Sequence, residues 1–119
     1  MGAAKDQTVI YHNPRCGKSR AALALLQERG VDFRVVEYLK SPPDKAQLRT
    51  LLRQLGMRPA QLVRRGEDLY KEKFAGKTLD DEQWLDALAA HPILIERPIV
   101  VRGARAVVGR PPERVRELL

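Results

Sequence analysis

The first 38 residues follow a strand–helix–strand pattern that limits the folds open to this chain. Residues 7–11 and 33–38 are rich in β-branched and aromatic side chains and predict strands, while residues 17–29 predict a helix between them. Gly30 suits the position just after a helix end. Two strands joined by a helix at this spacing pair in parallel within one sheet. The pattern therefore predicts an α/β protein.

The middle of the chain has a different, helical character. Residues 41–43 (SPP) stop the second strand, and Asp44 with Gln47 matches a capping box. Leucines follow at helical spacing, and Gly56 ends that helix. Further helices are expected at 59–65, 69–74 and 78–90, the last of which would bury Trp84, Leu85 and Leu88. Residues of about 44–91 are therefore predicted to form a helical insert.

Sheet-forming sequence returns near the end of the chain. Residues 98–101 and 106–108 are β-rich and flank an expected turn at 102–105, which predicts a hairpin. Two prolines then open a last helix, whose buried face would hold Val115, Leu118 and Leu119. The order β-α-β, helical block, β-β-α predicts one α/β domain over residues 1–119.

The only cysteine of the chain, Cys16, lies in the loop between the first strand and the first helix. Unpaired backbone N–H groups give a helix N-terminus about half a positive charge, which favours a thiolate and also binds oxyanions. Such a site can lower a cysteine pKa from about 8.5 to roughly 3.5–7.5. Cys16 is therefore the predicted nucleophile, in preference to a buried core cysteine.

Composition excludes several other classes of protein. The net charge is +7, but only 5% of the residues are aromatic and no Lys/Arg run exceeds two, so nucleic-acid binding is not expected as the main function. No apolar stretch approaches the ~18–20 residues of a membrane span. A single cysteine cannot form an internal disulfide, which fits a reducing cytoplasm.

Three motifs that resemble parts of the Cys16 loop fail on spacing. A nucleotide-binding P-loop needs a glycine five places before Gly17, where His12 stands instead. Cysteine phosphatases carry Cys-x5-Arg, and here the sixth residue after Cys16 is Ala22. A dithiol Cys-x-x-Cys motif fails at Ser19. Cysteine and histidine spacing also gives no convincing zinc site, so no metal is expected.

Three segments together resemble the glutaredoxin-linked arsenate reductase family. They are residues 12–20 (HNPRCGKSR), 96–101 (ERPIVV) and 109–113 (GRPPE), and their order and spacing agree with that family over nearly the whole chain. The resemblance implies a thioredoxin-like fold with a helical insertion. It also implies a cis proline at the start of the third strand, and Pro98 would be that residue.

The resemblance implies roles for six residues. Cys16 would be the nucleophile, and His12 and Ser19 would help to keep it ionised. Three arginines would bind the oxyanion: Arg64, Arg97 and Arg110. No tightly bound cofactor and no metal are implied.

The implied substrate is arsenate, whose oxygens match the planar donor fork of arginine. Reduction of As(V) to As(III) takes two electrons and hence two thiols, of which this chain supplies one. Glutathione is expected as the co-substrate, and a glutaredoxin would then regenerate the thiol of Cys16. The reaction would belong to the cytoplasm, with neither a membrane nor nucleic acid as a partner.

Lys18 departs from the best-known arsenate reductases, which have threonine there, and this keeps other functions open. One is a glutathione-dependent reductase of another substrate. A second is a thioredoxin-like thiol-redox regulator that binds RNA polymerase, although the regulators of this type available for comparison use the Cys-x-x-Cys motif that Ser19 excludes. A third is an anion-binding module without turnover.

Overall fold

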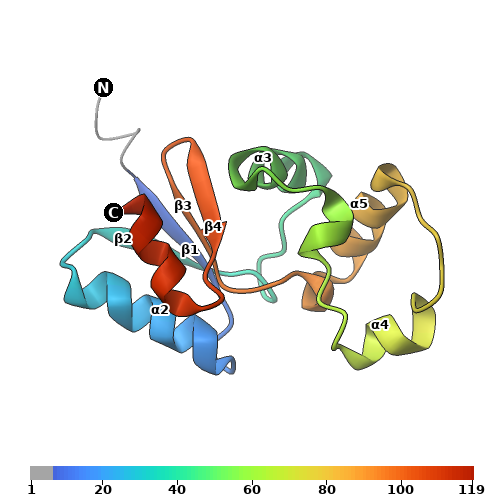
Figure 1. Cartoon of the computed structure of the whole chain (residues 1–119), viewed down its shortest axis with the longest axis horizontal. Helices are drawn as coiled ribbons and strands as arrows, with labels where there is room; N and C mark the ends of the chain where they lie inside the picture. Colours follow the sequence, from blue (N-terminus) through green and yellow to red (C-terminus); the bar gives the residue numbers. More distant parts are fainter. Residues whose placement is uncertain (1–6) are drawn as a thin grey trace. The chain divides into compact units, whose positions relative to one another are not determined.

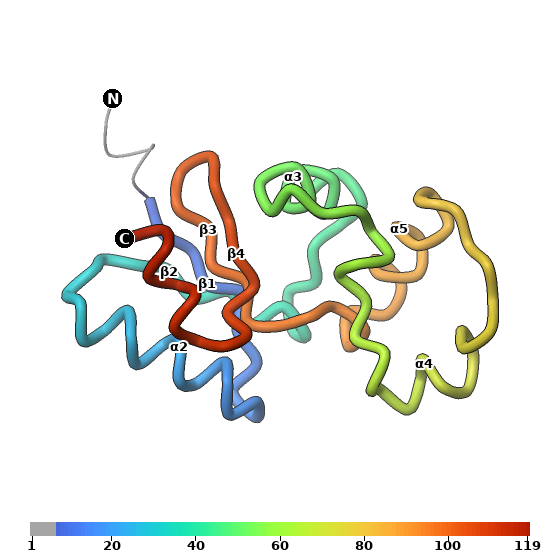
Figure 2. Tube along the Cα trace, in the orientation of Figure 1, coloured from blue at the N-terminus to red at the C-terminus, as the bar shows by residue number. Residues whose placement is uncertain are grey.

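A computed structural model of the chain describes residues 7–119, which divide into two compact units. One unit joins the described residues up to Ser41 with Arg97–Leu119, and the other is Pro42–Glu96. The first holds the whole sheet and the second is helical (Figures 1 and 2). A single domain over 1–119 with an insert at about 44–91 stays a prediction.

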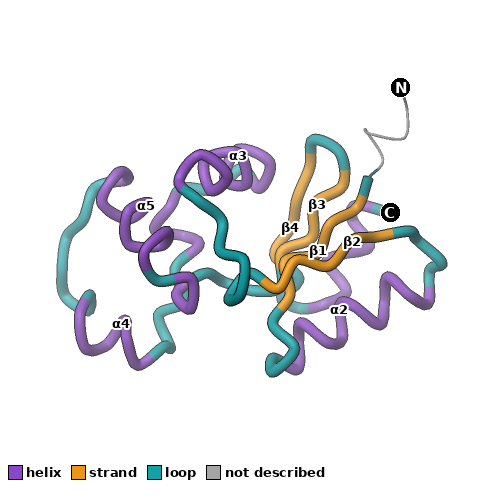
Figure 3. The backbone as a smooth tube through the Cα atoms, turned by 180° about the vertical axis from the view of Figure 1, so that it is seen from behind, coloured by secondary structure: helices purple, strands orange, loops and turns teal. Residues whose placement is uncertain are grey.

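A four-stranded sheet organises the first unit. Its strands are β1 (Thr8–His12), β2 (Phe33–Glu37), β3 (Ile99–Arg102) and β4 (Arg105–Val108), in the order β2-β1-β3-β4. Figure 3 shows them side by side. β1 pairs in parallel with β2 and antiparallel with β3, and β3 pairs antiparallel with β4. The predicted parallel β-α-β unit and the predicted hairpin are both confirmed.

Two helices pack beside each other against this sheet: α2 (Gly17–Glu28) and the 3-10 helix η3 (Pro112–Leu118). Ile10, Leu26, Val100 and Val115 meet there and are completely buried. Burying one such side chain contributes about 1.5–3 kcal/mol. This core fixes the start of α2, and with it Cys16, against β1.

The predicted buried side of the last helix is confirmed. Val115 and Leu118 are buried, and the partly buried Leu119, the residue after η3, packs against the same core. A 3-10 helix has three residues per turn, so residues i and i+3, here Val115 and Leu118, share a face.

The second unit contains α3 (Lys45–Leu55), α4 (Asp68–Lys73) and α5 (Asp81–Ala90), with the 3-10 helices η1 (Pro59–Leu62) and η2 (Pro92–Leu94). The predicted capping box forms between Asp44 and Gln47, and Gly56 ends α3 in the left-handed region at φ 68°. Helix α5 starts at Asp81 because Asp80 accepts a hydrogen bond from the Gln83 backbone N–H and caps it.

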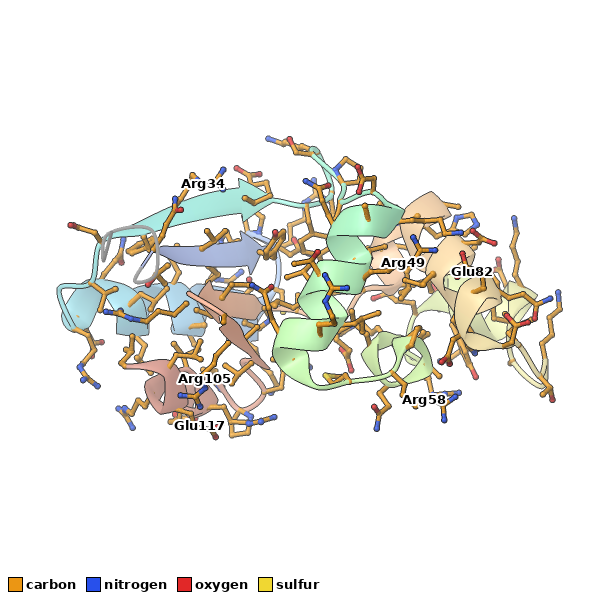
Figure 4. The ribbon with its side chains drawn as sticks, turned by 90° about the horizontal axis from the view of Figure 1, so that it is seen from above. Arg34, Arg49, Arg58, Glu82, Arg105 and Glu117 are labelled. Carbon is orange, nitrogen blue, oxygen red and sulfur yellow. The ribbon has the colours of Figure 1, made fainter. Side chains whose placement is uncertain are left out.

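Apolar contacts hold the second unit together. Trp84 is 4% exposed and Leu88 is fully buried, which confirms the core position predicted for Trp84. Arg49 of α3 and Glu82 of α5 lie next to each other, 2.7 Å apart between Nη2 and Oε2 (Figure 4). Both side chains are largely exposed, and exposed ion pairs contribute only about 0–1 kcal/mol. The buried side chains therefore supply most of the stability of this unit.

Candidate active site around Cys16

The loop between β1 and α2 is shaped by hydrogen bonds of Asn13, a buried residue. Its backbone carbonyl accepts from the Cys16 N–H and its side-chain Oδ1 accepts from the Arg15 N–H, both at 3.0 Å. Its own N–H donates to Ser19 Oγ, also at 3.0 Å. Cys16 is thereby held as the N-cap residue of α2, with extended backbone angles. Its thiol is partly exposed.

The surroundings of Cys16 favour the thiolate. Burial raises the pKa of the thiol, but the backbone N–H groups of Ser19 and Lys18 and the guanidinium of Arg97 lower it, so that the pKa lies below its ordinary value. Helix N-terminal N–H groups and a cation are the two influences that lower cysteine pKa values most often. The site therefore holds an activated sulfur.

Arg97 and Arg110 approach Cys16 from two loops of the same unit. Arg97 is 7% exposed, and its guanidinium lowers the pKa of the Cys16 thiol. Arg110 Nη1 lies 4.0 Å from Cys16 Sγ and donates to the Arg97 carbonyl oxygen at 3.0 Å. The Arg97–Pro98 peptide bond is cis, as the resemblance implied, and so is Arg110–Pro111. Two guanidinium groups thus border one sulfur.

Gly109 allows the chain before Arg110 to approach Pro98 closely. Its N–H donates to the Pro98 carbonyl at 2.8 Å. A Cβ atom at this position would lie 2.9 Å from Pro98 Cγ and 3.3 Å from Val115 Cγ2. A side chain here would have to displace the proline or the core valine. Residue 109 therefore positions Arg110 by being a glycine.

His12 and Ser19 form a buried pair next to the thiol. His12 Nδ1 and Ser19 Oγ are 2.7 Å apart. Burial lowers the pKa of His12, Glu37 raises it and Arg20 lowers it further, with a net decrease. The Ser19 hydroxyl bonds His12 and Asn13, and it is the Ser19 backbone N–H that acts on Cys16. The hydroxyl of Ser19 therefore organises the loop.

Arg64 belongs to the helical unit, where it pairs with two carboxylates. Its Nε donates to Glu67 Oε2 at 2.9 Å, and its Nη1 lies 3.7 Å from Glu96 Oε1. The other five predicted site residues all lie in the sheet unit. Their proposed roles, like that of Arg64, stay predictions.

Sequence reasoning missed two residues that shape the site. The role of Asn13 could have been predicted, because Asn before Pro in a strand-to-helix loop is typical of a turn stabilised by its side chain. Gly109 carries no such signal, since its glycine requirement comes from side chains distant in sequence. Within residues 7–119, no cluster of three His, Cys, Asp or Glu side chains could hold a metal ion. None of the helices described there is long and apolar enough to cross a membrane.

Fold and site together define a thioredoxin-like protein with a single cysteine at the start of its first described helix. The family model of the ArsC family matches residues 11–118, and the chain belongs to that family. This confirms the family resemblance inferred from the three sequence segments.

Individual relatives agree with this assignment. The chain is 52% identical over 115 residues to the uncharacterized protein YfgD of Escherichia coli, covering 95% of this chain and 97% of that one. It is 48% identical over 112 residues to an arsenate reductase of Neisseria meningitidis, covering 92% and 96%. A solved structure of an arsenate reductase from Vibrio cholerae superposes with a TM-score of 0.91 at 46% identity, covering 96% and 98%.

Proposed function

We propose that this chain is an arsenate reductase in which the Cys16 thiolate attacks arsenate. The observation that carries the proposal is the pair of guanidinium groups, from Arg97 and Arg110, at a sulfur whose pKa is lowered at the start of α2. Several relatives that cover nearly the whole chain are named arsenate reductases. The resemblance adds Arg64 as a third oxyanion ligand.

The first step joins two negative species, and this explains the need for cations. Two like unit charges 4 Å apart at an effective dielectric constant near 20 repel by about 4 kcal/mol. Guanidinium groups offset this repulsion and offer forked donors to the arsenate oxygens. The thiolate forms an S–As bond, one oxygen takes up two protons and leaves as water, and arsenic stays As(V). The product is a covalent Cys16–arsenate adduct.

The second step needs an external thiol, because the chain has one cysteine. We propose glutathione for this role, as a co-substrate that is not tightly bound. Its thiolate attacks the Cys16 sulfur, and the electron pair of the S–As bond stays on arsenic. Arsenic is thereby reduced to As(III) and leaves as arsenite, while the two sulfurs are oxidised to a mixed disulfide.

A glutaredoxin would complete the cycle. Its thiolate takes the glutathione from Cys16 by thiol–disulfide exchange and returns the Cys16 thiol. This chemistry belongs to a compartment with a glutathione pool, and we propose the cytoplasm. Neither a resident cofactor nor a metal takes part in this scheme.

The test is a coupled assay with arsenate, glutathione, glutaredoxin, glutathione reductase and NADPH. Arsenate-dependent NADPH consumption is expected, and it should disappear in Cys16→Ser and when glutaredoxin is omitted. No turnover in the complete system would refute arsenate reduction. Turnover without glutaredoxin would refute only the proposed partner.

A second candidate function is glutathione-dependent reduction of another substrate, and the observation that favours it is Lys18. This residue is exposed in the first turn of α2, where the best-known reductases that the chain resembles carry threonine. It adds a positive charge beside the thiol. If arsenate gives no turnover while glutathione still forms a mixed disulfide on Cys16 that glutaredoxin removes, this candidate replaces the first. A thiol-redox regulator would show the same exchange without any small substrate.

A further inference from the structure

The positive charge of the protein is concentrated in the sheet unit. Residues 7–41 and 97–119 contain 12 Lys and Arg but five Asp and Glu, whereas residues 42–96 contain nine of each kind. Residues 1–6 hold one Lys and one Asp, so the formal net charge of +7 belongs to the unit that carries Cys16. Charge of one sign on one part of a protein attracts partners of the opposite sign and speeds their association.

Three exposed cations lie within four residues of Cys16: Arg15, Lys18 and Arg20. The side chains of Arg15 and Lys18 form no hydrogen bond and no ion pair with any residue of 7–119. Arg20 Nη1 donates to the Pro14 carbonyl at 3.0 Å and pairs with no carboxylate of the same residues. No ion pair within that range therefore neutralises these three charges, which we call the cationic rim.

The charges on α2 oppose the dipole of this helix at both ends. Acidic residues in the first turn and basic residues in the last turn stabilise a helix. Helix α2 has no acidic residue in its first turn, where Lys18 and Arg20 lie, and no basic residue in its last turn, where Glu28 lies. Helix α5 shows the favourable pattern, with Asp81 and Glu82 in its first turn. The stability of α2 therefore does not explain why the rim is cationic.

A comparison with α3 shows how such a charge can be compensated. Lys45 is the first residue of α3 and would oppose its dipole in the same way, but it pairs with Glu82 and Asp86. Lys18 has no such partner among residues 7–119. Exposed charges that oppose local stability and lack an internal partner are expected where a protein binds something else.

We propose that the cationic rim is a docking surface for a redox protein that carries acidic residues around its own reactive cysteine. This inference rests on the proposed function, in which a glutaredoxin removes glutathione from Cys16. The glutaredoxin thiolate attacks the glutathione sulfur, the S–S bond to Cys16 breaks, and the Cys16 sulfur leaves as a thiolate, so the step is neither an overall oxidation nor a reduction. Cations next to Cys16 would hold the partner where its sulfur must react.

An acidic protein fits the rim better than other anions do. In the proposed site, a small oxyanion is bound by the guanidinium groups of Arg97 and Arg110, which border the sulfur itself. Three exposed cations spread over six positions suit several carboxylates of one partner surface. Nucleic acid would also be attracted, but only 5% of the residues are aromatic, which leaves few rings for base stacking.

The test starts from the mixed disulfide of Cys16 with glutathione, prepared with oxidised glutathione, so it needs no arsenate. Release of glutathione is measured by mass spectrometry with two reductants. One is a glutaredoxin with acidic residues around its cysteine, and the other is the small thiol β-mercaptoethanol. The small thiol reports the intrinsic reactivity of the disulfide, including how readily Cys16 leaves. The ratio of the two rate constants, called the exchange ratio here, therefore isolates protein docking.

Charge at residue 18 should set the exchange ratio. At about 20 mM salt, Lys18→Gln should lower the ratio about threefold and Lys18→Glu about tenfold, because electrostatic steering of the partner is lost and then reversed. Lys18→Arg should keep the wild-type ratio, since it keeps the charge. Arg15→Gln should act like Lys18→Gln. All these effects should become small at about 300 mM salt, where exposed charges are screened.

Stability gives a second readout that a structural role for Lys18 would move in the other direction. Lys18→Glu places an acidic residue in the first turn of α2, so it should raise the urea midpoint of the mixed disulfide while it lowers the exchange ratio. A fall in both would assign the slower exchange to damage to the fold and would overturn the docking role.

Arg29 provides a matched control on the same helix. It is exposed at the C-terminal end of α2, about 17 Å from Lys18 along the helix at 1.5 Å per residue, which exceeds the Debye length of ~8 Å at physiological salt. Arg29→Glu changes the net charge as much as Lys18→Glu does, and the exchange ratio should stay within a factor of about two at physiological salt. An equal fall in both variants there would overturn a local docking surface.

The partner side of the contact can be tested as well. A glutaredoxin in which lysine replaces the acidic residues around the cysteine should reverse the effect, so that Lys18→Glu raises the exchange ratio. A single-stranded RNA oligonucleotide that binds at physiological salt and is released by Lys18→Glu would overturn the proposal in favour of nucleic acid.

The outcomes separate this inference from the proposed function. Equal exchange ratios in the wild type and all rim variants, with arsenate turnover intact in the coupled assay, would overturn the docking surface alone. Charge-dependent exchange without arsenate turnover would overturn arsenate reduction and support the docking surface. A glutaredoxin that is no faster than β-mercaptoethanol would overturn both the proposed partner and this inference.

Discussion

Arginine has opposite surroundings in the two units of the molecule. In the sheet unit, the Arg97 guanidinium lowers the pKa of the Cys16 thiol, and Arg110 Nη1 lies 4.0 Å from the Cys16 sulfur. In the helical unit, Arg64 faces the carboxylates of Glu67 and Glu96. The family resemblance assigns the same role to all three arginines, but the residues around Arg64 differ from those around Arg97 and Arg110.

This difference indicates that arginine has two separate roles in the protein: lowering the pKa of the thiol and binding the oxyanion. Arg97 lowers the pKa of Cys16 and so makes the nucleophile, besides any contact with the oxyanion. Arg64 instead pairs with the carboxylates of Glu67 and Glu96. Its contribution should therefore be limited to holding the oxyanion.

The largest expected effect comes from comparing Arg97→Ala with Arg64→Ala. Both should raise KM for arsenate, by roughly tenfold to a hundredfold, because a charged hydrogen bond contributes about 1.5–3 kcal/mol. Only Arg97→Ala should also raise the pKa of Cys16, because that guanidinium lowers it. The measurement is the iodoacetamide alkylation rate of Cys16 against pH, together with the coupled assay.

Arg110→Ala serves as a second variant, because Arg97 is buried and its loss could disturb folding. Circular dichroism shows whether each variant stays folded. An alkylation midpoint that moves equally in Arg64→Ala and Arg97→Ala would contradict the separate roles of the two arginines. So would wild-type alkylation that rises only above the free-thiol pKa of about 8.5.

Substitution of two glycines, one in each unit, tests whether the chain at Gly109 is closely packed. Gly109→Ala should cost about 1–3 kcal/mol of stability, because its Cβ would press on Pro98 and Val115. Gly66→Ala is the control in the helical unit, where a Cβ meets nothing within 4 Å. That change should be neutral or stabilise by up to about 1 kcal/mol. Urea unfolding measures both, and equal midpoints would contradict the close approach at Gly109.

Much of the fold could be predicted because it depends on local signals. Runs of β-branched and aromatic side chains identify β1 and β2, and the Asp44–Gln47 capping box with Gly56 marks both ends of α3. The 3-10 geometry of η3 could not be predicted, because its sequence also suits an α-helix.

The site was predictable only where a motif identified its residues. The position of Cys16 before α2 follows from local sequence, and the lowered pKa follows from that position. The carboxylates around Arg64 were not predicted, since Glu96 is 32 positions away in the sequence and reaches Arg64 only through the bridge between Val63 and Ile95. Pairing between residues so distant in the chain produces no periodic pattern in the sequence.

The hydroxyl groups of Ser19 and Thr50 allow a further comparison of the two units. Ser19 is fully buried and its Oγ bonds both His12 and Asn13. Thr50 is exposed on α3, where its hydroxyl donates to the Ala46 carbonyl and accepts a long hydrogen bond from the exposed Arg53 guanidinium. Ser19→Ala should cost about 1–3 kcal/mol, because two buried polar atoms lose a partner. Thr50→Ala should stay within about 0.5 kcal/mol.

The same Ser19 variant tests how the thiolate is stabilised. The backbone N–H of residue 19 survives the substitution, so the pKa of Cys16 should remain below its ordinary value even as stability falls. Thermal unfolding gives the stability and alkylation gives the pKa. A Cys16 that reverts to ordinary thiol behaviour in Ser19→Ala would mean that the hydroxyl, and not the backbone, maintains the thiolate.

The smallest expected effect is a pH dependence confined to the sheet unit. The pKa of His12 is lowered on folding, chiefly by burial, so between that pKa and the unfolded value of about 6.5 the unfolded chain binds a proton that the folded chain does not. Stability should therefore fall as pH drops through this window, by at most about 1.4 kcal/mol per pH unit, and the loss should stop below the folded pKa. Urea midpoints from pH 7.5 to 5.5 measure it, and His12→Gln should flatten the slope, since a glutamine cannot take up the proton. A slope that survives unchanged in His12→Gln would assign the effect to other groups and remove His12 from the account of the site.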